Sequence, residues 1–239
     1  MSLVDLDHVS HIPVQVQEVF DVSGAGDTVV AVFAAAIAVG LDPIEAANLA
    51  NIAAGLVVGK LGTAAISLED LNHAAVHSRV ATGKVKVVTR ETAREIRNVW
   101  RRNGECVGYA NGCFDILHPG HLALLHRARG SCDRLIVGLN SDASVQRLKG
   151  TGRPAQTEAD RAKILAALSD VDLVVIFGED TPELLIQELS PDLLVKGADY
   201  ERKDVVGGDF VEGIGGKVLL VDLESGYSTS DTIAKIRGS

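Results

Sequence analysis

The chain has 239 residues, of which 46% are hydrophobic and only 4% aromatic, so it can form one large or two small domains with aliphatic cores. Its formal charge of −9 argues against a nucleic-acid-binding surface, although a few local cations can still form a nucleotide pocket. The three cysteines form no CxxC pair, and neither a membrane-spanning apolar run nor a signal peptide is recognisable, so we expect a cytoplasmic protein without membrane binding.

The first predicted elements are two nearly apolar helices, one over residues 25–39 and one from residue 43 to about residue 58. Gly40 is expected to end the first helix, and Pro43 to begin the second, in line with the usual positions of glycine and proline at helix ends. Because both helices contain so few polar residues, we expect them to be buried.

The segment Asp-Val-Ser-Gly-Ala-Gly-Asp-Thr, residues 21–28, combines a glycine turn with the start of the first helix, as phosphate-binding segments do. It resembles the GAGD motif of ribokinase-like sugar kinases, and the similarity continues through residues 51–63 and ends near residue 78. By that resemblance, Gly24, Ala25 and Gly26 would form an anion hole, and Asp27 would be the base that accepts the sugar hydroxyl proton.

Such kinases are much longer and place this motif late in the chain. We therefore interpret residues 1–78 as the carboxyl-terminal remnant of a kinase domain and expect no kinase activity from it. Its apolar helices would lack the sheet that they normally cover, and large exposed apolar patches commonly bind a partner. We expect them to be buried against the second domain or in a homodimer.

Residues 79–104 are predicted to be a linker with a helix. The pattern Thr92-Ala-Arg-Glu95 is a capping box, and Ile96, Val99 and Trp100 follow at helical spacing. Gly104 would end this helix.

From residue 105 to residue 239, apolar strand candidates alternate with helical patterns. The strands are expected at 106–110, 134–139, 172–177, 192–196 and 217–221, and the helices at 119–130, 141–148, 157–168, 181–189 and 229–237. This alternation predicts an α/β domain with a doubly wound parallel sheet, in which a ligand binds beyond the carboxyl ends of the strands.

Residues 110–121, Ala-Asn-Gly-Cys-Phe-Asp-Ile-Leu-His-Pro-Gly-His, lead from the first of these strands into a helix. His118 and His121 share one helix face at its start, where backbone N–H groups attract anions, so both can bind one phosphate group. Two histidines at this spacing can also pack or cap a helix, or chelate a metal, but no third metal ligand is recognisable. The Gly-x-Phe-Asp sequence before them favours phosphate binding.

This stretch resembles the HxGH signature of nucleotidyltransferases that join a nucleotide to a phosphorylated small molecule. The segments Arg-Leu-Lys-Gly (147–150), Leu-Val-Lys-Gly-Ala-Asp-Tyr (194–200) and Tyr-Ser-Thr-Ser (227–230) match later motifs of that group, in order. Within the group, the sequence most resembles the adenylyltransferase half of the bifunctional heptose-phosphate kinase and adenylyltransferase family, which makes ADP-heptose for lipopolysaccharide. The last motif of that family often has two threonines after its serine, where this chain has Thr229 and Ser230.

The resemblance implies catalytic roles for His118, His121 and Lys149, which would bind phosphate and stabilise the transition state. It implies nucleotide or phosphate binding by Asn111, Gly112, Cys113, Phe114, Asp115, Gly120, Lys196, Gly197, Ser228, Thr229 and Ser230. Asp115 would brace the turn or orient a histidine rather than transfer a proton. Lys149 and Lys196 could also be ordinary lysines at element ends, and Mg²⁺ would enter with ATP without an assigned protein ligand.

The expected reaction is transfer of AMP from ATP to a sugar 1-phosphate, D-glycero-D-manno-heptose 1-phosphate, with release of pyrophosphate. A cytidylyltransferase that uses CTP and glycerol phosphate or a related alcohol phosphate is the alternative, because the two histidines do not select the base. The preference for ATP depends on the kinase remnant, which would link two steps on one sugar. A nucleotide-binding module without turnover is a second alternative, which the complete set of catalytic groups disfavours.

Overall fold

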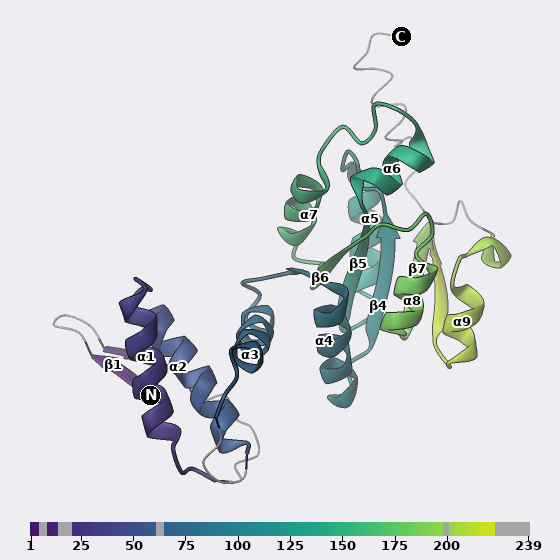
Figure 1. Cartoon of the computed structure of the whole chain (residues 1–239). Helices are drawn as coiled ribbons and strands as arrows, with labels where there is room; N and C mark the ends of the chain where they lie inside the picture. Colours follow the sequence, from purple (N-terminus) through teal and green to yellow (C-terminus); the bar gives the residue numbers. More distant parts are fainter. Residues whose placement is uncertain (5–8, 14–20, 61–64, 198–200, 223–239) are drawn as a thin grey trace. The chain divides into compact units, whose positions relative to one another are not determined.

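The structure, a computed structural model, describes residues 1–4, 9–13, 21–60, 65–197 and 201–222. It divides the chain into two compact units, unit 1 from Met1 to Lys84 and unit 2 from Val85 to Ser239 (Figure 1). Among the described helices, none is both long enough and apolar enough to cross a membrane.

Unit 1 consists of a short antiparallel strand pair and three helices. The elements are β1 (Ser2–Val4), β2 (Val9–His11), α1 (Ala25–Ala38), α2 (Pro43–Val58) and α3 (Leu68–Ala81). Helix α2 packs against both α1 and α3. The structure therefore contains both helices predicted for this region and adds α3.

The two predicted helices differ in burial. Helix α2 buries a stripe of small residues that includes Ala46, Ala50 and Ala53, as expected. In α1 only Ala36 is buried, and Val30 is 69% exposed. Within unit 1 alone, α1 is therefore largely exposed, because a helix that packs mainly against one neighbour covers only one stripe of its surface, and its expected burial against unit 2 or in a homodimer stays a prediction.

Unit 2 contains a six-stranded sheet in which every neighbouring pair is parallel. The strands are β3 (Val87–Val88), β4 (Val107–Gly112), β5 (Arg134–Asn140), β6 (Leu173–Phe177), β7 (Leu193–Gly197) and β8 (Lys217–Val221), in the order β3-β6-β5-β4-β7-β8. The predicted α/β class is confirmed. After β6 the chain crosses to the other side of β4, so the topological switch point lies between β4 and β7.

In the described part of unit 2, six helices and one 3₁₀ turn accompany this sheet (Figure 1). They are α4 (Arg90–Arg102), α5 (Pro119–Arg129), α6 (Asp142–Lys149), α7 (Glu158–Ala166), α8 (Glu183–Leu189), η1 (Arg202–Asp204) and α9 (Gly208–Gly213). Right-handed crossovers in opposite directions place α5 and α7 on one face and α8 and α9 on the other. The helix predicted at 229–237 lies outside the described residues.

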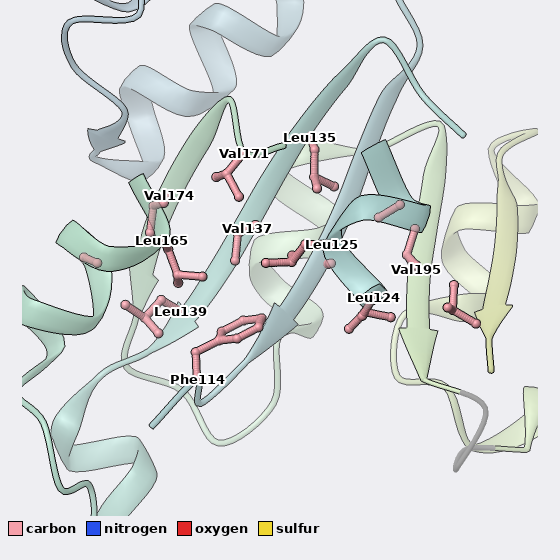
Figure 2. Packing of buried hydrophobic residues seen from close by; sticks show 14 of the residues in the cluster. Phe114, Leu124, Leu125, Leu135, Val137, Leu139, Leu165, Val171, Val174 and Val195 are labelled. Atoms are coloured by element: carbon pink, nitrogen blue, oxygen red, sulfur yellow. The ribbon is translucent and has the colours of Figure 1, made fainter. Parts of the chain in front are cut away.

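The main core of unit 2 fills the space between the sheet and helices α5 and α7. Figure 2 shows Leu124 and Leu125 of α5 and Leu165 of α7 against Val137 of β5, with Phe114 at the carboxyl end of β4. Because strands in a doubly wound sheet are buried on both faces, their sequences are almost continuously apolar. The core thereby holds the strand ends that carry the polar motifs.

Helix α4 begins earlier than predicted and belongs to unit 2. Its N-cap is Thr89, whose hydroxyl accepts a hydrogen bond from the Thr92 amide at 3.3 Å. Trp100 is buried under the guanidinium of Arg134, and Arg97 donates a hydrogen bond to the Ser190 carbonyl after α8. The expected linker at residues 79–104 thus contains the end of α3 together with β3 and α4 of unit 2.

A close approach between strands gives a stability prediction at Gly138. A Cβ there would lie 2.0 Å from the buried Tyr109 hydroxyl, and overpacking of this kind costs about 1–3 kcal/mol. Gly138→Ala should lower the free energy of unfolding, measured by urea denaturation, by about that amount. Gly213→Ala, where a Cβ meets open space in α9, is the control and should not lower it.

Candidate active site

A pocket of about 600 Å³ opens at the carboxyl end of the sheet, at the switch point between β4 and β7. This volume lies within the usual range for small-molecule sites. It is lined by many of the residues singled out in the sequence, namely Asn111, Gly112, Cys113, Phe114, His118, Gly120, His121, Lys149, Lys196 and Gly197. The fold therefore brings together motifs that are far apart along the chain.

The two histidines stand at the first turn of α5. His118 is the N-cap residue in an extended conformation, and Pro119 occupies the first helical position, which suits its fixed φ. One turn of chain brings the two rings into a stack, with centroids 3.8 Å apart and planes 23° apart. The Nδ1 atom of His121 is buried and has no hydrogen-bond partner among the described residues.

Both imidazoles are uncharged near neutral pH. Burial, followed by the positive charge of Lys149, lowers the pKa of His118 below its ordinary value. Burial lowers the pKa of His121 to about 4, with smaller effects from His118 and Lys149. Two imidazolium ions could not stack at this distance without strong repulsion, so the neutral pair is the stable form of the ligand-free site.

Phe114 packs its ring near the ring of His121. Its backbone is in the left-handed region, with φ at 44°, which is uncommon for a bulky residue. Its buried ring lies 5.1 Å from the ring of His121 and contacts the backbone of Gly112, where a Cβ would come within 3.2 Å. The lack of a side chain at Gly112 thus leaves room for the aromatic ring that fixes His121.

Lysines lie on both sides of the imidazole pair. Lys149 is the last residue of α6 and is exposed, with Gly150 following at a φ of 88°. Lys196, on β7, is only 9% exposed, and its ammonium donates a hydrogen bond to the side-chain amide oxygen of Asn111 at 2.6 Å. The site therefore offers cationic groups to an anionic ligand without charging its histidines.

Asp115 does not line the pocket. Its buried carboxylate accepts hydrogen bonds from Arg153 at 2.5 Å and from the Ala155 amide at 2.6 Å. Burial alone would raise the pKa of Asp115, but the contacts with Arg153 and Ala155 lower it overall. The structure thus places this residue as a brace between the histidine turn and the loop after Lys149.

A buried arginine that sequence reasoning missed joins the strand ends. Arg161 of α7 is 1% exposed and donates to the Cys113 carbonyl at 2.5 Å and to the Asn140 carbonyl at 2.9 Å. It also pairs with Asp142 at 2.7 Å. The sequence signal that could have identified Arg161 is its position on the buried face of α7, which also contains Ala162 and Leu165.

Comparison with known proteins assigns the family. The sequence profile of the cytidylyltransferase-like family matches residues 109–233, more than half of the chain. The chain belongs to the cytidylyltransferase-like family. Residues 2–71 match the profile of the pfkB family of carbohydrate kinases, so unit 1 is similar to part of such a kinase.

Two curated relatives resemble the whole chain. A bifunctional protein HldE from Rhodospirillum rubrum is 57% identical over 239 residues, which are 100% of this chain and 48% of the relative. The HldE protein from Paramagnetospirillum magneticum is 56% identical over 240 aligned residues, which are 100% of this chain and 49% of that protein. The chain thus spans about half the length of the curated relatives that it matches.

The residues of the kinase-like motif do not line this pocket. Gly24 is the N-cap of α1, with Ala25, Gly26 and Asp27 in the first turn, all in unit 1. The glycine turn at a helix start is thus present as predicted. Ser228, Thr229 and Ser230 lie outside the described residues.

Several pocket residues were not predicted from the sequence. They are Leu124, Leu148, Asp180, Thr181, Pro182 and Val206. Asp180 and Thr181 follow β6 directly, so the rule that polar groups after parallel strands share one rim could have found them. The aliphatic residues carry no comparable signal, because their patterns match those of ordinary core residues.

No group of three or more metal-binding side chains is placed to hold a metal ion in the described part of the chain. The carboxylates nearest the strand ends, Asp115, Asp142 and Asp180, each accept a hydrogen bond from an arginine. Their charge is thereby already compensated, which makes them poor candidates for a resident cation.

The effect of Lys149 on the histidines can be measured directly. Lys149→Ala should raise the pKa of His118 and of His121, because the nearby positive charge disfavours each imidazolium. The measurement is an NMR titration of the ring resonances of the ligand-free protein, where wild-type His121 should titrate near pH 4. Lys163→Ala, an exposed position on α7 outside the pocket, is the control. Unchanged histidine pKa values in Lys149→Ala would contradict the assigned geometry.

Proposed function

We propose that unit 2 transfers the AMP group of ATP to D-glycero-D-manno-heptose 1-phosphate, which gives ADP-heptose and pyrophosphate. The observation that carries the proposal is the stacked, uncharged His118–His121 pair in a pocket with lysines on both sides. Family membership supports a nucleotidyltransferase. The presence of a kinase-like unit 1 in the same chain fits relatives that are named bifunctional.

The reaction needs no covalent enzyme intermediate. An oxygen of the sugar phosphate attacks the α-phosphorus of ATP, a new P–O bond forms, and the bond to the bridging oxygen of the leaving pyrophosphate breaks. Because the protein forms no bond to phosphorus, positioning and electrostatic stabilisation supply the rate enhancement. Both tasks are supported by the hydrogen-bond donors that line the pocket at the start of α5 and at the ends of α6 and β7.

The neutral histidines have a clear role in this scheme. Each ring can donate one hydrogen bond to a phosphate oxygen, and the buried Nδ1 of His121 has no other described partner. The negative charge of a bound triphosphate favours imidazolium, so binding raises the pKa of both rings. The histidines thus become stronger donors when the phosphate that they stabilise is present.

Mg²⁺ enters this proposal as part of the ATP substrate. Bound together with ATP, it would neutralise part of the triphosphate charge. The arginine pairs of Asp115, Asp142 and Asp180 give no reason to assign it a protein ligand.

A cytidylyltransferase that uses CTP and glycerol phosphate is the second candidate, and the name of the matched family favours it. Residues 198–200, which follow Lys196 and Gly197 at the end of β7, lie outside the described residues. The choice between the two bases is therefore a matter for experiment. The homodimer, the cytoplasmic location and the absence of kinase activity stay predictions.

The substrate assignment predicts a selective pyrophosphate release. ATP with heptose 1-phosphate should release pyrophosphate at a rate well above that of ATP alone, and CTP with glycerol phosphate should not. A coupled phosphate assay with all four combinations of nucleotide and acceptor measures this. Release with CTP and glycerol phosphate alone would establish the second candidate instead.

The histidine assignment predicts a large loss of turnover. His121→Ala should lower kcat by roughly 10²- to 10³-fold, the effect of removing one preorganised donor to a developing negative charge. His126→Ala is the matched control, because His126 lies on the same helix, its side chain is 81% exposed, and it does not line the pocket. A normal kcat in His121→Ala would remove the histidine from the mechanism.

A further inference from the structure

The pocket has two chemically different halves on either side of the imidazole pair. Toward β7, the lining includes Asn111, Lys196 and Gly197. Toward β5 and β6, on the other side of β4, it contains Lys149 of α6 and the loop residues Asp180 and Thr181. A transfer between two substrates needs two such half-sites, with the reacting phosphorus between them.

The charges of the two halves suit different ligands. The half beside β7 presents the cation Lys196 to a ligand, which favours a polyphosphate. In the half beside β6, Arg147 compensates the charge of Asp180, and the oxygens of Asp180 and Thr181 accept hydrogen bonds from hydroxyl groups. Beyond Lys149, this half is therefore suited to a neutral molecule with many hydroxyl groups.

The carboxylate of Asp180 is held in place by α6. Arg147 donates from Nε to Oδ1 of Asp180 at 2.6 Å and from Nη2 to the Gly178 carbonyl at 2.6 Å. Oδ2 of Asp180 has no partner among the described residues, and the side chain is 59% exposed. The same helix ends in Lys149. The ion pair therefore links the Asp180 carboxylate to the helix that carries Lys149.

We propose that the half-site beside β6 binds the acceptor and that Asp180 determines its sugar specificity. Asp180, together with the Thr181 hydroxyl, accepts hydrogen bonds from the sugar hydroxyl groups, while Lys149 holds the phosphate of the same molecule beside the imidazoles. Arg147 is a positioning residue that acts through Asp180. This inference rests on the proposed function and names the residues that recognise the sugar part of its acceptor.

Asp180→Asn tests the inference, because it keeps the shape of the side chain and removes its charge. The KM for heptose 1-phosphate should rise about 10- to 100-fold, as expected for the loss of hydrogen bonds to a charged group, while the KM for ATP stays the same. Glu183→Gln is the matched control: Glu183 is an exposed carboxylate at the start of α8 that does not line the pocket. An unchanged KM for heptose 1-phosphate, or an increase confined to the KM for ATP, would overturn the inference.

Arg147→Ala tests the positioning role separately. It should raise the KM for heptose 1-phosphate in the same direction, and the double variant with Asp180→Asn should be no worse than the more impaired single variant. Additive effects would show that Arg147 does not act through Asp180.

Direct binding separates this inference from the proposed function. Calorimetry without ATP should show weaker binding of heptose 1-phosphate to Asp180→Asn, with no loss of affinity for inorganic phosphate as the probe of the Lys149 subsite. Equal binding of heptose 1-phosphate by variant and wild type would overturn the inference alone. Wild-type binding of heptose 1-phosphate without pyrophosphate release from ATP would overturn the proposed function alone.

Discussion

The guanidinium of Arg161 is the interaction on which the geometry of the site depends. It is buried beneath the pocket and binds the carbonyl groups of Cys113 and Asn140, which follow or end the neighbouring strands β4 and β5. Its pairing with Asp142 adds the first turn of α6 to the same network. Because α6 carries Lys149 and the β4 turn carries the histidines, one cation sets the relative positions of three parts of the site. An apolar side chain at this position would remove the donor that the two carbonyl groups share.

The pocket combines uncharged imidazoles with lysines at its sides, and both features follow from the fold. The helix start after β4 buries His121 against Phe114, and burial keeps the ring neutral. The switch between β4 and β7 brings Lys196 to one side, and the end of α6 brings Lys149 to the other. A phosphate group that enters meets donors from several elements at once. This convergence explains how a chain with a net charge of −9 can form a pocket suited to the anionic nucleotide that we propose as its ligand.

The sequence predicted the parallel sheet well, because its buried strands are short apolar runs between clear turns. The histidine turn was also predictable, since its chemistry lies in consecutive residues. Interactions between segments that are far apart in the sequence could not be predicted. Arg161 and Asp180 act through partners elsewhere in the chain, and the two-residue strand β3 is too short for a periodic signal. The N-cap residue of α4 is Thr89 rather than Thr92, where the sequence pattern predicted the helix start. Helix α3, with Ser67 as its N-cap residue, was not predicted.

The central claim is that the His118–His121 pair receives the α-phosphate of a triphosphate in unit 2. The most direct test is a crystal structure of the protein with a non-hydrolysable ATP analogue. The account predicts that oxygens of the α-phosphate lie within hydrogen-bond distance of ring nitrogens of both histidines, with the acceptor half beside β6 left open. A triphosphate bound elsewhere, with both imidazole rings out of contact with phosphate, would contradict it.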